Sequence, residues 1–194
     1  RQTVYSSGFN REIAGKVISF IEKENFNCCW NLYSGDNWIV KDKSDERVIT
    51  EENIVKTEAT SGSVESLSND AKIGKILCIC NPDKTDEIED KIKKNFPDLS
   101  VVKSFYTMIE IMAPGITKGS AVLELCRLWN IDVKRAAAFG DNFNDVEMLE
   151  VVGLPFLMEN APDELKQRFK TITDSNNDEG IYKALVKVGA IEQR

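Results

Sequence analysis

The segment 140–145 carries a dense group of side chains that could bind a metal ion. It reads Gly-Asp-Asn-Phe-Asn-Asp and directly follows the short apolar run 136–139. Asp141, Asn144 and Asp145 are three and four residues apart, so their side chains can face the same side of one helical turn. Carboxylates and an amide are hard oxygen donors, which suit Mg²⁺ and leave its other positions to water and a phosphate. The pattern predicts a magnesium site with Asp141 and Asp145 as ligands.

The same segment also has a purely structural interpretation. Asn142 can cap a helix, and Asp145, three residues later, can complete a capping-box-like pair at the positive end of the helix dipole. Spacing alone leaves the two interpretations about equally open. Gly140 favours binding, because a residue without a side chain lets a ligand approach the backbone.

A lysine in the segment 114–119 stands where a cation is normally disfavoured. Thr117 can cap a helix, which places Lys118 in the first helical turn. A bound anion would explain the lysine, because free backbone N–H groups and the ammonium can both hold a phosphate. The alternative is a surface lysine that bends into solvent.

Two polar loops later in the sequence could border the same site. Residues 160–164 and 174–180 each follow a predicted strand. Ligands in open α/β sheets bind beyond the carboxyl ends of the strands, so these loops could reach the same crevice. The favoured interpretation is nevertheless a helix cap and a polar turn without direct chemistry.

Composition excludes several other chemistries. The 194 residues include no histidine, which removes serine–histidine and cysteine–histidine catalysis and any zinc site that needs imidazole. The formal net charge is −7, and the mixed signs offer no broad positive surface to nucleic acid or to a membrane. No apolar run is long enough to span a bilayer. Any anion must therefore be held locally.

The five cysteines are odd in number and scattered, which predicts reduced thiols and a cytoplasmic protein. Cys28, Cys29, Cys78 and Cys80 could in principle form a four-thiolate zinc site. Their spacing is wrong for the usual zinc knuckles, and both pairs lie in apolar, strand-like runs. Buried small side chains are the favoured interpretation.

The elements that must position these residues fall into two regions. Residues 10–112 predict a mixed α+β unit with an antiparallel sheet, in which 41–72 are solvated surface with some helix or strand that the pattern does not place. Its elements are a helix that begins after Asn10, strands 27–34, 37–40, 75–80, 100–104 and 107–112, and a helix over 84–95. From residue 113 short apolar strands alternate with amphipathic helices, which predicts half of a doubly wound parallel sheet. Its elements are strands 136–139, 154–157 and 171–173 and helices that begin near Lys118, Asn142, Asn160 and Glu179.

Four ordered motifs resemble the Cof-type, type IIB branch of the haloacid-dehalogenase superfamily. They are EIMAPGITKGSAV, RAAAFGDNFNDVEMLE, NAPDELK and TDSNNDEGIYKAL. The resemblance implies an α/β fold: a Rossmann-like core, partial in this chain, with an inserted α+β cap domain. It assigns residues 1–9 to a linker, 10–112 to the cap domain and 113–194 to the returning core. The implied activity is Mg²⁺-dependent hydrolysis of a small phosphorylated metabolite, whether a sugar phosphate, a nucleotide or a cofactor phosphate.

The same resemblance implies a role for each site residue. Lys118 would bind phosphate and stabilise the transition state. Asp141 would coordinate Mg²⁺, and Asn144 would contact the phosphoryl group or the substrate. Asp145 would orient the loop or the lysine without contacting the metal directly. Lys118, Asp141 and Asp145 thus form the expected catalytic set, over which the cap domain would close.

The attacking residue that the resemblance requires is missing. In such enzymes an Asp-x-Asp pair supplies the nucleophile and the general acid, but no Asp-x-Asp occurs in the 194 residues. Family order places it before residue 1, so we expect a truncated chain that is inactive alone and leaves apolar faces and strand edges uncovered. Two alternatives stay open: a non-catalytic phosphate-binding or interaction module of the same fold, and a structural α/β domain with ordinary helix caps.

Overall fold

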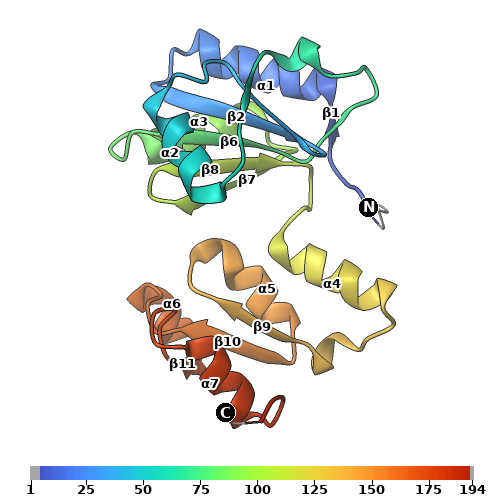
Figure 1. Ribbon diagram of the computed structural model, residues 1–194, viewed down its shortest axis with the longest axis vertical. Helices are drawn as coiled ribbons and strands as arrows, with labels where there is room; N and C mark the ends of the chain where they lie inside the picture. Colours follow the sequence, from blue (N-terminus) through green and yellow to red (C-terminus); the bar gives the residue numbers. More distant parts are fainter. Residues whose placement is uncertain (1–4, 193–194) are drawn as a thin grey trace. The chain divides into compact units, whose positions relative to one another are not determined.

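The computed structural model describes residues 5–192, which form two compact units (Figure 1). The first unit ends at Ile116 and the second begins at Thr117. The turn at Pro114-Gly115, where Gly115 has a φ of +68°, lies just before this boundary. The sequence changes character at 112/113, close to the same point. No helix within residues 5–192 has both the length and the apolar character that a membrane crossing requires.

The first unit is built on a mixed six-stranded sheet of order β4-β3-β2-β6-β8-β7. All neighbours pair antiparallel except β3 and β4. Its strands are β2 (Cys28–Ser34), β3 (Asn37–Val40), β4 (Thr60–Ser61), β6 (Lys75–Cys80), β7 (Ser100–Phe105) and β8 (Met108–Met112). A separate two-stranded ladder joins β1 (Phe9–Asn10) to β5 (Lys72–Ile73). The predicted antiparallel α+β unit is confirmed.

Helices α1 (Arg11–Lys23) and α3 (Thr85–Asn95) contribute to the main core of this unit. Asn10 caps α1 as predicted, since its side chain accepts a hydrogen bond from the N–H of Ile13 at 2.9 Å. The main core contains alternate residues of the central strands, including Trp30, Leu32 and Ile76. The intervening residues face the other side of the sheet. There, Trp38 and Val40 form a smaller cluster with Val48 of α2 (Glu46–Val55).

Residues 41–72 contain the helix and strand segments that the sequence predicts without placing them. Besides α2, this stretch forms β4, the short 3-10 helix η1 (Val64–Ser66) and the start of β5. Val48, Ala59, Val64 and Leu67 are all buried. Each of these short elements buries only one or two apolar side chains. The apolar residues therefore show neither a helical nor a strand period along the sequence.

The second unit is a three-stranded parallel sheet of order β11-β10-β9, as the sequence predicts. The strands are β9 (Ala137–Gly140), β10 (Leu154–Met158) and β11 (Ile172–Thr173). The helices are α4 (Lys118–Leu128), α5 (Val146–Val151), α6 (Asp163–Arg168) and α7 (Gly180–Lys187), with 3-10 turns η2 (Val133–Arg135) and η3 (Phe143–Asp145). Leu149 and Leu157 lie at the centre of the unit's core. The carboxyl ends of all three strands therefore lie at one edge of the sheet.

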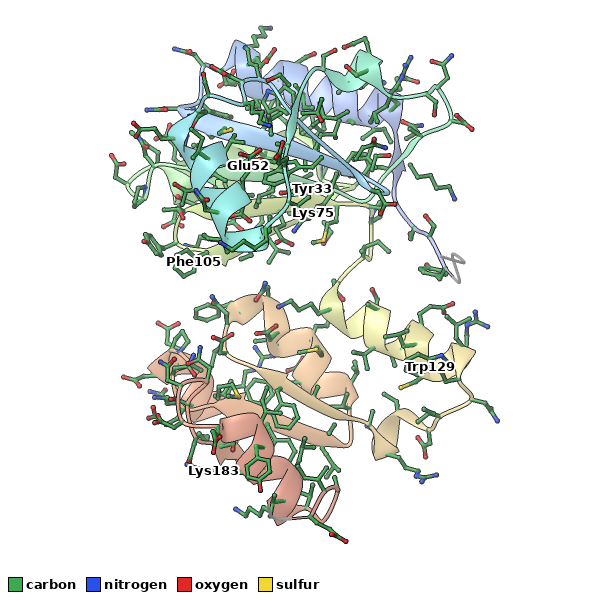
Figure 2. The ribbon with its side chains drawn as sticks, viewed as in Figure 1. Tyr33, Glu52, Lys75, Phe105, Trp129 and Lys183 are labelled. Atoms are coloured by element: carbon green, nitrogen blue, oxygen red, sulfur yellow. The ribbon has the colours of Figure 1, made fainter. Side chains whose placement is uncertain are left out.

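Apolar side chains of α4 are less covered than their helical spacing predicts. Leu125 and Trp129 have 44% and 65% of their surface exposed, and Figure 2 shows Trp129 at the end of α4. Within residues 5–192, strand β9 pairs with β10 on one side and has no partner strand on the other. The unit thus presents an apolar helix surface and a free strand edge.

Candidate active site

The carboxylate of Asp145 holds the loop after β9 together by accepting hydrogen bonds from the backbone of the same loop. Asp145 is only 3% exposed, and its Oδ2 accepts hydrogen bonds from the backbone N–H groups of Asp141 and Asn142 at 2.9 and 3.1 Å. Asn142 has extended backbone dihedrals and forms a capping box with Asp145 over η3. The structural interpretation of the segment is therefore confirmed. This capping role does not exclude a binding role for the segment, because the Asp141 side chain is not part of the capping box.

The other oxygen of Asp145 holds the predicted lysine. Lys118 Nζ forms an ion pair with Asp145 Oδ1 across 27 positions of sequence. The lysine side chain is 49% exposed, whereas that of its partner is almost fully enclosed. Both carboxylate oxygens of Asp145 are thus engaged within the chain, and the ammonium stays accessible to a ligand. The structure brings these two sequence-predicted site residues together.

The N-terminus of α4 reaches this loop because α4 packs closely on α5. A Cβ atom on Gly119 would lie 2.9 Å from the carbonyl carbon of Glu147, so only glycine permits this approach. Thr117 and Ser120 form a reciprocal capping box, with N–H to Oγ distances of 2.9 and 3.0 Å. Thr117 is therefore the predicted N-cap, and Lys118 stands in the first turn.

Asp141 has a different environment from Asp145. Its side chain lies at the exposed end of β9, and Oδ2 accepts a hydrogen bond from Asn160 Nδ2 at 2.9 Å. Asn160 Oδ1 in turn accepts from the N–H of Asn176 at 3.0 Å. The loops after β9, β10 and β11 are therefore linked in one polar chain. The sequence indicates only that the segment 160–164 could border the site, and its pattern gives no sign that Asn160 bridges the loops.

Asn144 lies in η3 between the two aspartates and is partly exposed. It is thus close in sequence and space to the Lys118–Asp145 pair. Among residues 5–192, no group of three or more His, Cys, Asp or Glu side chains is placed to enclose a metal ion. Asp141 is the exposed carboxylate of this strand-end loop. The described residues therefore supply at most part of a metal site.

The structure gives a reason for glycine at position 140 that the sequence alone does not reveal. A Cβ atom at this position would lie 2.5 Å from Cβ of Asp145, far inside van der Waals contact. From the sequence, this glycine favours the close approach of a ligand. The structure shows that it makes room for the buried carboxylate that holds the loop together.

Known proteins resemble this chain over most of its length. A family model of haloacid dehalogenase-like hydrolases matches residues 1–185. A curated protein of Haemophilus influenzae is 36% identical over 151 residues, which are 78% of this chain and 56% of that protein. The 5-amino-6-(5-phospho-D-ribitylamino)uracil phosphatase YcsE of Bacillus subtilis is 33% identical over 103 residues, 53% of this chain and 41% of the relative. The chain spans about half the length of the curated relatives that it matches.

The fold has close counterparts among solved structures. That of the HAD subclass IIB sugar phosphatase BT4131 matches with a TM-score of 0.81 at 22% identity, over 98% of this chain and 71% of the other. At this level of identity the likeness concerns the fold. It extends over both units of the chain, because nearly every residue is covered.

Proposed function

This chain belongs to the family of haloacid dehalogenase-like hydrolases, and from that premise we propose that its parent protein is a Mg²⁺-dependent phosphatase of small phosphorylated metabolites. The observation that carries the proposal is the accessible ammonium of Lys118, held by buried Asp145 at the N-terminus of α4. We assign the second unit to the catalytic core. The first unit is then the cap domain that selects the substrate.

Lys118 is suited to bind a phosphoryl group. Its ammonium stands at the positive end of α4, where the helix dipole and free backbone N–H groups also favour an anion. The Asp145 carboxylate restricts where the ammonium can move, so little conformational freedom is lost when phosphate binds. A lysine fixed in this way can stabilise the negative charge that develops on the equatorial oxygens during transfer. The partly exposed amide of Asn144 could donate to the same oxygens or to the substrate.

The residues present fit a magnesium ion in part. Mg²⁺ usually takes one or two protein carboxylates and keeps water and substrate phosphate as its other ligands. Asp141 offers an exposed carboxylate oriented by Asn160, and it is our candidate ligand. Asp145 was also predicted as a ligand, but its engaged oxygens favour the positioning role that the family resemblance implies. When bound, Mg²⁺ would neutralise charge on the transferring phosphoryl group.

We place the attacking carboxylate outside these 194 residues, because they contain no Asp-x-Asp pair. The first Asp of such a pair would attack phosphorus while the bond to the leaving oxygen breaks, which yields an aspartyl-phosphate. The second Asp would protonate the leaving oxygen and later activate the water that hydrolyses the intermediate. By this proposal the chain alone binds phosphate but does not turn over substrate.

The names of two similar proteins support a phosphate ester on a small polyhydroxy compound. One is a phosphatase of a phosphoribitylamino uracil, and the other is a sugar phosphatase. Sugar phosphates, nucleotides and cofactor phosphates all share this phosphomonoester group. The side chains of the first unit would decide among them.

The test uses the parent protein with its whole reading frame and p-nitrophenyl phosphate as substrate. We expect hydrolysis that requires Mg²⁺ and stops with EDTA, and a fall in kcat on the order of 100-fold or more in Asp141→Asn. Asp98→Asn, a matched charge change at an exposed turn of the first unit, should leave kcat unchanged. Full metal-dependent activity in a folded Asp141→Asn variant would refute the assignment. A parent sequence without Asp-x-Asp and without turnover would favour the non-catalytic binding module instead.

A further inference from the structure

Three cysteines share one face of the sheet in the first unit. Cys28, the first residue of β2, lies directly opposite Cys80, the last residue of β6. Cys78 is two positions back on β6, so its side chain points to the same face as that of Cys80. Cys78 and Cys80 are buried, whereas Cys28 is partly exposed. Cys28 is therefore the one residue of the three that is not fully buried.

Cys28 and Cys80 form a non-hydrogen-bonded antiparallel pair, the kind in which the two Cα atoms lie closer together. The N–H of Cys80 donates to the carbonyl of Thr107 at 2.7 Å, and that of Cys28 donates to the carbonyl of Phe26 at 2.7 Å. The two cysteines therefore do not exchange backbone hydrogen bonds. Cα atoms in such pairs are about 4.5 Å apart. This separation lies within the range of about 4.4–6.8 Å that a disulfide spans.

A positive charge is fixed beside this pair. Arg47 Nη1 donates to the carbonyl oxygens of Asn27 and Ile79 at 3.3 and 3.4 Å, and these residues precede Cys28 and Cys80. Asp45 binds the same guanidinium through both carboxylate oxygens, at 2.9 and 2.6 Å. The arginine therefore bridges the two strands where the cysteines face each other.

The environment distinguishes Cys28 from its neighbour in sequence. The neighbouring thiols of Cys78 and Cys80 lower the pKa of Cys28 well below that of a free thiol, and the positive charge of Arg47 lowers it further, against the opposing effect of burial. Burial has the opposite effect on Cys29, whose side chain faces the other side of the sheet and whose pKa rises to about 11. The thiolate is the reactive form, so these adjacent cysteines differ in expected reactivity.

We propose that Cys28 is an oxidation site for hydrogen peroxide and that Cys80 resolves it as an intramolecular disulfide. The Cys28 sulfur attacks one peroxide oxygen: an S–O bond forms, the O–O bond breaks, and hydroxide leaves and takes up a proton to become water. The Cys80 sulfur then attacks the Cys28 sulfur: an S–S bond forms, the S–O bond breaks, and the leaving hydroxide takes the Cys80 proton as a second water. Two thiols are oxidised and one peroxide is reduced.

The first experiment treats the protein with hydrogen peroxide, blocks free thiols and digests with trypsin without reduction. Cleavage after lysine separates residues 24–41, which contain Cys28, from residues 76–84, which contain Cys80. We expect these peptides to be linked, to separate with dithiothreitol, and to fragment as a Cys28–Cys80 disulfide. Cys29→Ser is the matched control and should keep the link. A Cys28–Cys78 link, or no link, would overturn the role of Cys80.

Two further measurements keep the proposal falsifiable if a variant at buried Cys80 fails to fold. Dimedone should label Cys28 in the peroxide-treated wild type, and more strongly in Cys80→Ala if that variant folds. Iodoacetamide at pH 5.5 should alkylate Cys28 at least about tenfold faster than Cys29. Arg47→Gln should reduce that ratio, because it removes the nearby positive charge. Equal alkylation of Cys28 and Cys29, or dimedone labelling of Cys126 in preference to Cys28, would overturn the proposal.

Discussion

Asp145→Ala should destabilise the second unit, and the contacts of Asp145 set the size of the effect. The substitution leaves the N–H groups of Asp141 and Asn142 without their carboxylate acceptor. Hydrogen bonds to a charged group contribute about 1.5–3 kcal/mol each, which gives a ceiling of about 3–6 kcal/mol. Both N–H groups are only partly buried, and the freed Lys118 is half exposed, so water recovers some of this free energy. We expect a loss of about 2–4 kcal/mol.

Native-state hydrogen exchange followed by mass spectrometry measures this loss unit by unit. Peptides from residues 137–158 should exchange faster by the factor that corresponds to the lost free energy, and peptides from β6 of the first unit should not change. Asp141→Ala is the matched control. Its carboxylate is exposed and accepts one side-chain hydrogen bond, so the expected cost is below about 1 kcal/mol. Equal costs for the two alanine variants, or a cost below 1 kcal/mol for Asp145→Ala, would refute the reasoning.

Two glycine substitutions test the packing in opposite directions. Gly140→Ala should lower the free energy of unfolding by about 2 kcal/mol or more, because the new Cβ would lie 2.5 Å from Cβ of buried Asp145; an unchanged melting temperature would contradict the loop geometry. Gly15→Ala lies in the interior of α1, where the nearest atom to the new Cβ is Val64 Cγ1 at 3.9 Å. The added helix propensity should stabilise the protein by about 0.5–1 kcal/mol in urea unfolding, and a loss of stability would show that α1 packs more tightly than described.

Sequence patterns predicted the fold where a single element buries several side chains. The spacing of Val17 and Ile21 and the cap at Asn10 predicted α1, and the apolar run 75–80 predicted β6. The pattern failed over residues 41–72, where α2 buries only Val48. An element held by one apolar side chain leaves no period to detect, because tertiary packing rather than local pattern stabilises it.

The sequence indicates the members of the candidate site but not the contacts between them. Strand ends and helix starts identified Lys118 and Asp141, since those positions follow from chain order in a parallel sheet. The ion pair between Lys118 and Asp145 depends instead on how closely α4 approaches α5 across Gly119, which a spacing of 27 residues does not reveal. The bridge from Asn160 to Asp141 likewise depends on where the loop after β10 ends.

The two aspartates of the loop have different environments, although their spacing in the sequence makes both of them candidate ligands. Asp145 accepts from the loop backbone, pairs with Lys118 and is enclosed, so its charge is already balanced within the chain. Asp141 is exposed and accepts one hydrogen bond from a neutral amide, and no lysine or arginine within residues 5–192 forms an ion pair with it. A bound cation would therefore gain most from Asp141. Substitutions at Asp145 should consequently change stability and the position of the lysine, and substitutions at Asp141 should change metal binding while the fold persists.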